Sequence, residues 1–239
     1  NHLNIQSVSI VPGDVDIDPS AKSLLGKEAS YILGERATPK SIVAVTGGSS
    51  VATLSQHLIE AKPFNTMKFV SARGSMRNDV SLQANTLVSQ FAKKCGGQYH
   101  TLLLPEFLSE QAYTLMMEEP IVKETVQLYD DANIVIHGIG TASEMGKRRK
   151  MSEEDNAQLV DKGAVGEAFG YFFDELGNVV YRIQTVGIQI EQVKKSKLIL
   201  AIAGGKSKAM AIEAYFKIAA KHTVLITDEG AADEILSKL

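Results

Sequence analysis

Two turns of small residues follow apolar runs, and both have the residue types that bind anions. The first turn, Thr46–Ser50, follows the run 42–45 and precedes apolar residues at helical spacing. This pattern predicts a strand, a tight turn and a helix start. Backbone N–H groups at such a turn favour a phosphate, although a plain helix cap is the alternative. A second turn, 204–208, follows the run 198–203 in the same way. Together the two turns predict a phosphorylated small molecule as ligand.

Three basic residues stand where they could meet such a ligand. Arg73 directly follows the predicted strand 67–72, and an arginine there can form bidentate bonds to phosphate. A solvated loop charge is the alternative. Lys208 opposes the dipole of the helix that it begins, and a bound anion would relieve that conflict. Arg148 belongs to the dense basic run 147–150, in which neighbouring residues remain alternatives.

Strand ends and glycines supply further site residues. Gly138 and Gly140 follow the predicted strand 134–137 and permit close backbone approach by a ligand. Glu167 lies among glycines and can accept bonds from sugar hydroxyls or act as an acid or base; a surface carboxylate is the alternative. We interpret His137 as a structural histidine in preference to a catalytic base.

Strands and helices alternate along most of the chain, which is typical of a parallel sheet covered on both faces. Ligands of such sheets bind beyond the carboxyl ends of the strands. The first helix is predicted to start with Asp18 as N-cap and to end at Gly34. The pattern breaks at about 150–190, which predicts a β-containing insertion or lid. The remaining predicted strands are 8–11, 42–46, 67–72, 99–104, 134–137, 198–203 and 223–227, and the remaining predicted helices are 49–60, 82–95, 109–129, 207–220 and 229–238.

Composition narrows the function classes. The chain has 239 residues, 44% of them hydrophobic, and a formal net charge of −3, which argues against a nucleic-acid-binding surface. The single cysteine, Cys95, excludes an internal disulfide and a Cys-rich zinc site, and we expect it on a buried helix face. No signal peptide or 18-residue apolar run is present, so we expect a cytoplasmic protein that does not contact a membrane. No cofactor or metal is predicted.

Five motifs occur in the order expected for the sugar-binding domain of SorC-type bacterial transcriptional regulators, and the resemblance covers nearly the whole chain. It implies one effector-binding domain over residues 1–239. It also implies a Rossmann-like, doubly wound, mainly parallel sheet with a small β-containing insertion, related to glucosamine-6-phosphate deaminase and ribose-5-phosphate isomerase. The motifs are Thr46–Ala52, Ala72–Gly74, Gly138–Gly140, Gly163–Glu167 and Ala203–Ala209.

The resemblance implies a role in a repressor of glycolytic genes. The domain would sense fructose-1,6-bisphosphate, or a related phosphosugar, and control operator binding allosterically. It would form dimers or tetramers, and would reach DNA only through an N-terminal helix-turn-helix domain that these 239 residues do not contain. The ligand-binding residues carried over by motif are Gly47, Gly48, Ser49, Ser50, Arg73, Gly74, Gly138, Gly140, Arg148, Glu167 and Lys208.

A sugar-phosphate isomerase or deaminase on the same fold is the alternative function. The enzymes carry acidic catalytic residues after the middle strand, with an Asp-Glu pair in the isomerase. Here that position reads Gly138–Ser143, and only Glu144 follows. Isomerisation needs a positioned base, so we expect binding without turnover and no catalytic residues. A pure oligomerisation module would leave the anion-type turns unexplained.

Two expectations follow. The substitution Arg73→Ala should weaken bisphosphate binding while leaving the fold intact, and the chain alone should not bind operator DNA.

Overall fold

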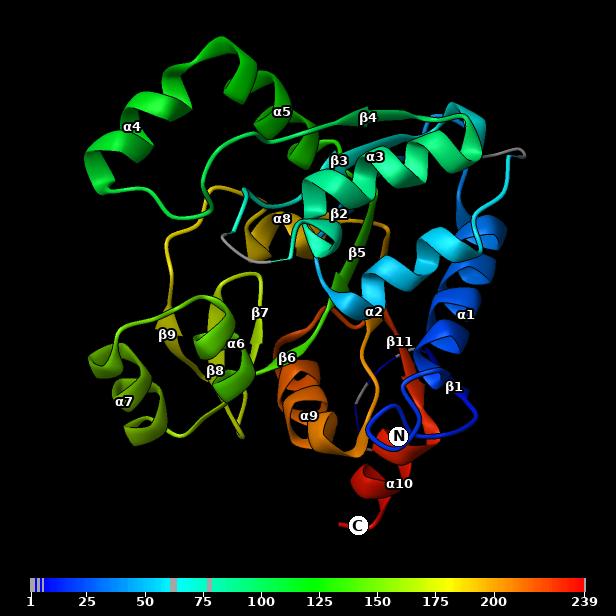
Figure 1. The fold of residues 1–239 in the computed structure, drawn as a ribbon, viewed down its shortest axis with the longest axis vertical. Helices are drawn as coiled ribbons and strands as arrows, with labels where there is room; N and C mark the ends of the chain where they lie inside the picture. Colours follow the sequence, from blue (N-terminus) through cyan, green and yellow to red (C-terminus); the bar gives the residue numbers. More distant parts are fainter. Residues whose placement is uncertain (1–2, 4, 6, 61–63, 77–78, 239) are drawn as a thin grey trace.

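The computed structural model describes residues 3, 5, 7–60, 64–76 and 79–238. Its centre is a seven-stranded sheet in the order β1-β11-β10-β5-β2-β3-β4, in which every neighbouring pair is parallel. The predicted α/β class with a parallel sheet is therefore confirmed (Figure 1). The strands are β1 (Ser7–Val11), β2 (Ile42–Val45), β3 (Lys68–Ser71), β4 (Gln98–His100), β5 (Ile134–Gly138), β10 (Leu198–Ile202) and β11 (Thr223–Asp228).

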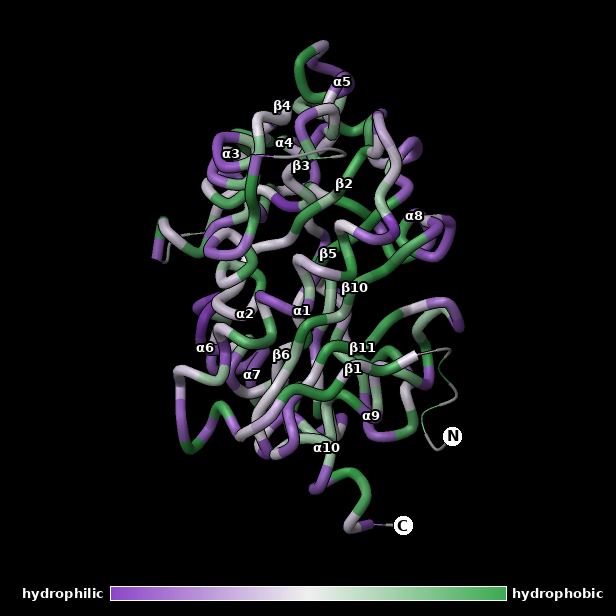
Figure 2. Tube along the Cα trace, turned by 90° about the vertical axis from the view of Figure 1, so that its right-hand side faces the viewer, coloured by the Kyte–Doolittle hydropathy of each residue, from purple (hydrophilic) through white to green (hydrophobic). Residues whose placement is uncertain are grey.

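Alternate residues along the strands of the large sheet supply two hydrophobic cores, one on each face of that sheet. Leu198, Leu200 and Ile202 of β10 face one core, while Ile199 and Ala201 face the other. Both sets are buried because helices cover both faces of the sheet, which is why these strands read as continuous apolar runs. Figure 2 shows the hydrophobic colour along β5 and β10 in the interior.

The first core holds helices α1 and α3, and the second holds α5, α8, α9 and α10. Cys95, at the end of α3, is buried in the first core, as predicted. Figure 1 shows α4 extending away from the body of the sheet, next to α5. The helices are α1 (Ala21–Arg36), α2 (Ser49–Ala52), α3 (Ala84–Cys95), α4 (Glu110–Glu118), α5 (Pro120–Asp130), α8 (Ile190–Lys195), α9 (Ala209–Ile218) and α10 (Glu229–Leu236), with 3-10 turns η1 (Thr53–Gln56), η2 (Phe64–Thr66), η3 (Val80–Leu82) and η4 (Lys206–Lys208).

The first helix starts and ends later than predicted. Ser20 holds the N-cap position of α1, and Asp18 accepts hydrogen bonds from the backbone and hydroxyl of Ser20. At the other end α1 continues through Gly34 to Arg36, with Ala37 as C-cap. Pro39 explains why α1 ends at Arg36, because proline disfavours helical backbone just before it and often follows a helix end.

Two other predicted helices are divided. The stretch 109–129 breaks at Glu119, which is extended because Pro120 follows it, and Pro120 then begins α5. The predicted helix 49–60 is only α2 followed by η1. Thr53 and Ser55 donate their hydroxyls to backbone carbonyls three residues earlier, which competes with regular helix formation.

A second, four-stranded antiparallel sheet follows β5, in the order β6-β7-β8-β9. Its hydrophobic contacts include Met145, Leu159 and Phe172, and β7 packs on α9. The predicted β-containing insertion is thus present, although its first strand starts at residue 140. Its elements are β6 (Gly140–Thr141), α6 (Ala142–Arg148), α7 (Glu153–Asp161), β7 (Ala164–Ala168), β8 (Tyr171–Asp174) and β9 (Val179–Arg182). Within the described residues, no helix is both long and apolar enough to span a membrane.

Candidate functional site

The chain reverses its direction across the large sheet between β2 and β5. From β2 it proceeds through β3 to the edge at β4, and it then returns to β5 and continues to the other side. The connections that leave the carboxyl ends of the neighbouring strands β2 and β5 therefore run to opposite sides of the sheet. Ligands of open α/β sheets bind at such a switch point. A cavity lies there, and counting its opening to solvent it measures about 650 Å³.

The turn after β2 forms one wall of this cavity. Gly48 has a φ of 128° and occupies the N-cap position of α2, where it has no side chain to cap the helix. Gly47 packs against Leu82, whose carbonyl would lie 2.6 Å from an added Cβ. The first N–H groups of α2, at Ser49 and Ser50, have no partner within the helix. These N–H groups and the two hydroxyls supply hydrogen-bond donors for an anion.

In the second glycine turn, 204–208, backbone N–H groups are bonded to carboxylates of the chain itself. The N–H of Gly205 donates to both carboxylate oxygens of Asp228, at 2.9 and 2.8 Å. The N–H of Ser207 donates to Asp16 at 2.7 Å. Carboxylates of the chain itself thus occupy the place expected for a phosphate. The interpretation of 204–208 as a second anion-binding turn is therefore wrong, although the side chain of Lys208 still reaches the cavity.

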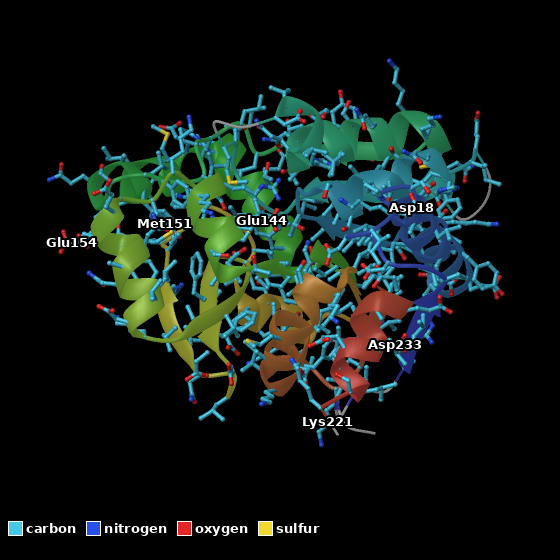
Figure 3. The ribbon with its side chains drawn as sticks, turned by 60° about the horizontal axis from the view of Figure 1, so that its bottom comes forward. Asp18, Glu144, Met151, Glu154, Lys221 and Asp233 are labelled. Atoms are coloured by element: carbon cyan, nitrogen blue, oxygen red, sulfur yellow. The ribbon has the colours of Figure 1, made fainter. Side chains whose placement is uncertain are left out.

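Positive charge gathers on the side of the cavity next to the first turn. Burial lowers the pKa of Lys208, and the nearby Lys22 and Arg148 lower it further, while Glu144 opposes them. Arg148 pairs with Glu144 one helical turn earlier at 3.7 Å. Glu144 lies near the middle of the view in Figure 3, whereas Glu154 on α7 lies at the outer edge. An anion bound beside Lys208 would offset the mutual repulsion of the cations.

A buried network of four charges forms the opposite side. Arg149 donates to Glu106 at 2.8 Å and to Glu167 at 2.7 Å. Arg73 lies 2.5 Å from the same Glu106 oxygen and 3.6 Å from Glu167. The side chains of Arg149 and Glu106 are fully buried. Because two arginines face two carboxylates, the network carries no net charge.

The network shifts the pKa values of Glu167 and Arg73. Burial alone would raise the pKa of Glu167, but Arg149 and Arg73 outweigh it and hold the pKa below its usual range. Burial and the neighbouring Arg149 lower the pKa of Arg73 despite the two carboxylates. Glu167 also accepts the N–H of Gly170 at 2.5 Å. Glu167 is thus an ionised hydrogen-bond acceptor at the cavity wall.

This environment changes the expectation for Arg73→Ala. Removing Arg73 would leave Glu106 and Glu167 buried with a single compensating charge. Loss of one partner from a buried ion pair is strongly destabilising. The expectation that this variant leaves the fold intact is therefore not supported by the geometry, and Arg73 is a poor choice for testing ligand binding.

All the predicted site residues except Gly74 line the cavity. Gly74 instead packs against the segment that holds Glu106, where an added Cβ would lie 2.6 Å from the carbonyl of Leu104. His137 is buried as a structural histidine. It contacts the carbonyl of Gly138 through Nδ1 at 2.9 Å and the hydroxyl of Tyr215 through Nε2 at 3.0 Å. Burial lowers its pKa to about 4.

Comparison with known proteins shows the family to which the chain belongs. Residues 1–237 match a family model described as "Putative sugar-binding domain". A solved SorC family transcriptional regulator from Enterococcus faecalis has 41% sequence identity and a TM-score of 0.91, over 98% of this chain and 96% of that one. The chain belongs to the SorC-type sugar-binding domain family.

Curated relatives of this SorC-type domain are longer. The chain is 42% identical to the central glycolytic genes regulator of Bacillus subtilis over 98% of this chain and 68% of the relative. The chain is 39% identical to the regulator of the same name from Priestia megaterium, over 98% of this chain and 68% of that relative. The full-length sorbitol operon regulator SorC from Klebsiella pneumoniae has 18% identity and a TM-score of 0.87 over 98% of this chain and 77% of that one, which shows a shared fold.

Sequence reasoning missed several residues of the candidate site. Glu106 and Arg149 form the buried network, yet they are 43 positions apart and follow no shared motif. Phe169 lines the cavity with a φ of 57°, a conformation for which its sequence gives no signal. Met76 and Met145 also line it. Arg149 lies within the basic run already identified, so the run supplies both a cavity cation and a buried one.

Proposed function

We propose that this SorC-type domain is the effector-binding part of a repressor of glycolytic genes and that it senses fructose-1,6-bisphosphate or a related phosphosugar. The observation that carries the proposal is the two-sided cavity at the switch point. One side offers the donors of the Ser49 turn together with Lys208 and Arg148. The other side offers Glu167, held ionised between two arginines.

The two sides match the two parts of a phosphosugar. A phosphate suits the cationic side, because charge-assisted hydrogen bonds to backbone N–H groups and lysine are strong. Sugar hydroxyls suit Glu167, because an ionised carboxylate is an acceptor with no proton to donate. The positive charges of Arg148 and Lys208 favour a phosphorylated ligand over a neutral sugar.

The same geometry favours binding without turnover. Isomerisation or deamination needs a positioned base and is most efficient when the pKa of that base lies near the operating pH. The pKa of Glu167 is held below its usual range, and both nitrogens of His137 are engaged beneath the cavity wall. Glu144 lines the cavity on α6 but is paired with Arg148. These environments favour a sensor over an enzyme.

In this proposal DNA contact belongs to the part of the regulator outside these 239 residues. The effector would act by binding two states of a dimer or tetramer with different affinity, since only differential affinity can shift such an equilibrium. The regulator would work in the bacterial cytoplasm, where its operator lies. A nuclease-protection assay on the chain alone should therefore show no operator footprint; a sequence-specific footprint would contradict this division of roles.

Isothermal titration calorimetry tests the proposed ligand. Fructose-1,6-bisphosphate, fructose-6-phosphate, glucose-6-phosphate, glucosamine-6-phosphate and ribose-5-phosphate are titrated into the parent chain and into Lys208→Met. We expect the bisphosphate to bind, and the variant to lose about tenfold or more, which is about 1.4 kcal/mol. Lys221→Met is the matched control, because Lys221 is exposed and lies far from Glu144 in Figure 3. Equal affinity in Lys208→Met and the parent would refute the assignment of this lysine.

A further inference from the structure

Lys22 on α1 lies beside the anion-binding side of the cavity, although neither the motifs nor the cavity lining include it. Its ammonium donates to the Ser49 hydroxyl at 3.3 Å. Its charge also reaches Lys208, where it contributes to the lowered pKa of that group. The first helix therefore places a cation next to the turn whose N–H groups and hydroxyls face the cavity.

The packing of α1 holds Lys22 in this position. Gly26 lies one helical turn after Lys22 on the same face, and a Cβ at Gly26 would come within 2.5 Å of Thr53. The absence of that Cβ permits α1 to approach η1 closely. Ser23 adds a hydrogen bond to Gln56 at 3.1 Å. The side chain of Lys22 is thus carried by a helix that is tightly joined to the turn it contacts.

The charge of Lys22 has little compensation. Among the residues that the structure describes, no carboxylate lies within 4.0 Å of its ammonium. Lys22 is the second residue of α1, and the first turn of that helix contains no acidic residue. A cation at this position opposes the helix dipole. Lys22 and Arg148 each lower the pKa of Lys208, against Glu144 and Asp16, which raise it. An anion beside Lys208 would offset both of these repulsions.

We propose that Lys22 is a phosphate-binding residue of this domain and that it holds, together with the Ser49 turn and Lys208, one phosphate group of the effector. This inference rests on the proposed function and deepens it. A bound phosphate would replace the neutral Ser49 hydroxyl as the partner of the Lys22 ammonium. The effector would thereby join α1 to the strand ends, and α1 follows β1 at the edge of the large sheet.

The test is calorimetry with fructose-1,6-bisphosphate on the parent, Lys22→Met, Lys22→Arg and Lys27→Met. Lys27 is an exposed lysine on the same helix and serves as the matched control. We expect Lys22→Met to raise the dissociation constant about tenfold, Lys22→Arg to restore most of the affinity, and Lys27→Met to change it less than twofold. Parent-like affinity of Lys22→Met, with the parent binding, would overturn the inference and leave the proposed function standing.

A second measurement separates failure of the Lys22 inference from failure of the proposed function. Lysines are reductively methylated with 13C, and the resonance missing in Lys22→Arg is assigned to Lys22. We expect this resonance to shift and saturate on titration with inorganic phosphate. If the parent binds none of the sugar phosphates, the proposed function fails; a saturating shift would then still support Lys22 as a phosphate ligand. The absence of any shift would overturn the inference in either case.

Discussion

Arg148 and Arg149 are adjacent in the sequence and have opposite environments. Arg148 lines the cavity and forms a partly exposed pair with Glu144, whereas Arg149 is fully buried between Glu106 and Glu167. A partly exposed ion pair contributes little to stability. Removing one partner of a buried pair leaves an uncompensated charge and is costly. The two neighbours therefore separate the ligand-binding role that we propose for Arg148 from the structural role of Arg149.

The substitution Arg149→Met should lower the free energy of unfolding by about 3–5 kcal/mol, because Glu106 and Glu167 would share only Arg73. Arg148→Met, the matched control, should change it by less than about 1 kcal/mol. Urea denaturation followed by circular dichroism measures both values. Similar stability in the two variants would show that the buried network is not what holds the cavity wall.

His137 predicts a pH dependence of stability. Burial lowers its folded-state pKa to about 4, against about 6.5 in an unfolded chain. Between these two pH values the unfolded state binds a proton at His137 and the folded state does not. The free energy of unfolding is therefore highest above about pH 6.5 and falls as the pH is lowered towards 4. Between pH 7 and 5 the parent should lose about 2 kcal/mol more than His137→Gln. Denaturation of both proteins at the two pH values measures this difference; identical losses would contradict the assignment.

At the residue scale, sequence patterns predicted which residues line the cavity, but not which of its charged side chains are neutralised by ion pairs. Small residues after β2, and glycines after β5, predict a ligand site because strand ends and turns are local features. The partners of Arg73 are not local, so its neutralisation by Glu106 could not be predicted. The same limit explains the error at turn 204–208, where Ser207 donates to Asp16, 191 positions away.

At the scale of elements, the close packing of α1 on η1 supports the turn at Ser49. A Cβ at Gly26 would lie 2.5 Å from both the backbone carbon and the side-chain oxygen of Thr53. Since backbone atoms cannot rotate away, either α1 or η1 must move. The position of α1 is therefore coupled to that of η1 and of the turn at Ser49 that precedes it.

We expect Gly26→Ala to destabilise the domain by about 1–3 kcal/mol, as overpacking does, and to weaken phosphosugar binding by displacing the turn. Gly34→Ala is the control on the same helix, because its nearest neighbour is the ring edge of Phe64 at 3.2 Å. Thermal unfolding and calorimetry of the two variants test this. A Gly26→Ala variant with parent-like stability and affinity would show that α1 does not position the turn.

Element types were predicted better than element ends. The interior parallel strands follow directly from apolar runs, and the structure confirms them. The edge strand β4 covers only Gln98–His100 of the predicted 99–104, because the backbone of Leu102 pairs with the side chain of Asn85 in place of a neighbouring strand. The helix breaks depend on particular residues whose effect was overlooked, such as Pro120 within 109–129 and Pro39 after α1. The early end of α2 depends on hydroxyl-to-backbone bonds from Thr53 and Ser55, which compete with the helix and leave no periodic signal.

At the scale of the whole molecule, the cavity joins two sheets. The turn after β2 and the ends of β3 and β5 belong to the large sheet, while Glu167 belongs to β7 of the small one. The network of Arg73, Glu106, Arg149 and Glu167 links them through buried ion pairs. An effector that binds both sides would bias the placement of the insertion relative to the large sheet, and a regulator requires such a response.

Phosphorus NMR of fructose-1,6-bisphosphate mixed with the domain tests the central claim most directly, because one spectrum reports both binding and chemistry. We expect both phosphate resonances to shift or broaden with the parent, to shift less with Lys208→Met at the same concentrations, and to give rise to no new resonance over hours. Unperturbed resonances with the parent would contradict the proposed effector. The same experiment with each monophosphate extends the test to catalysis, and a growing product resonance there would identify an enzyme and contradict the sensor.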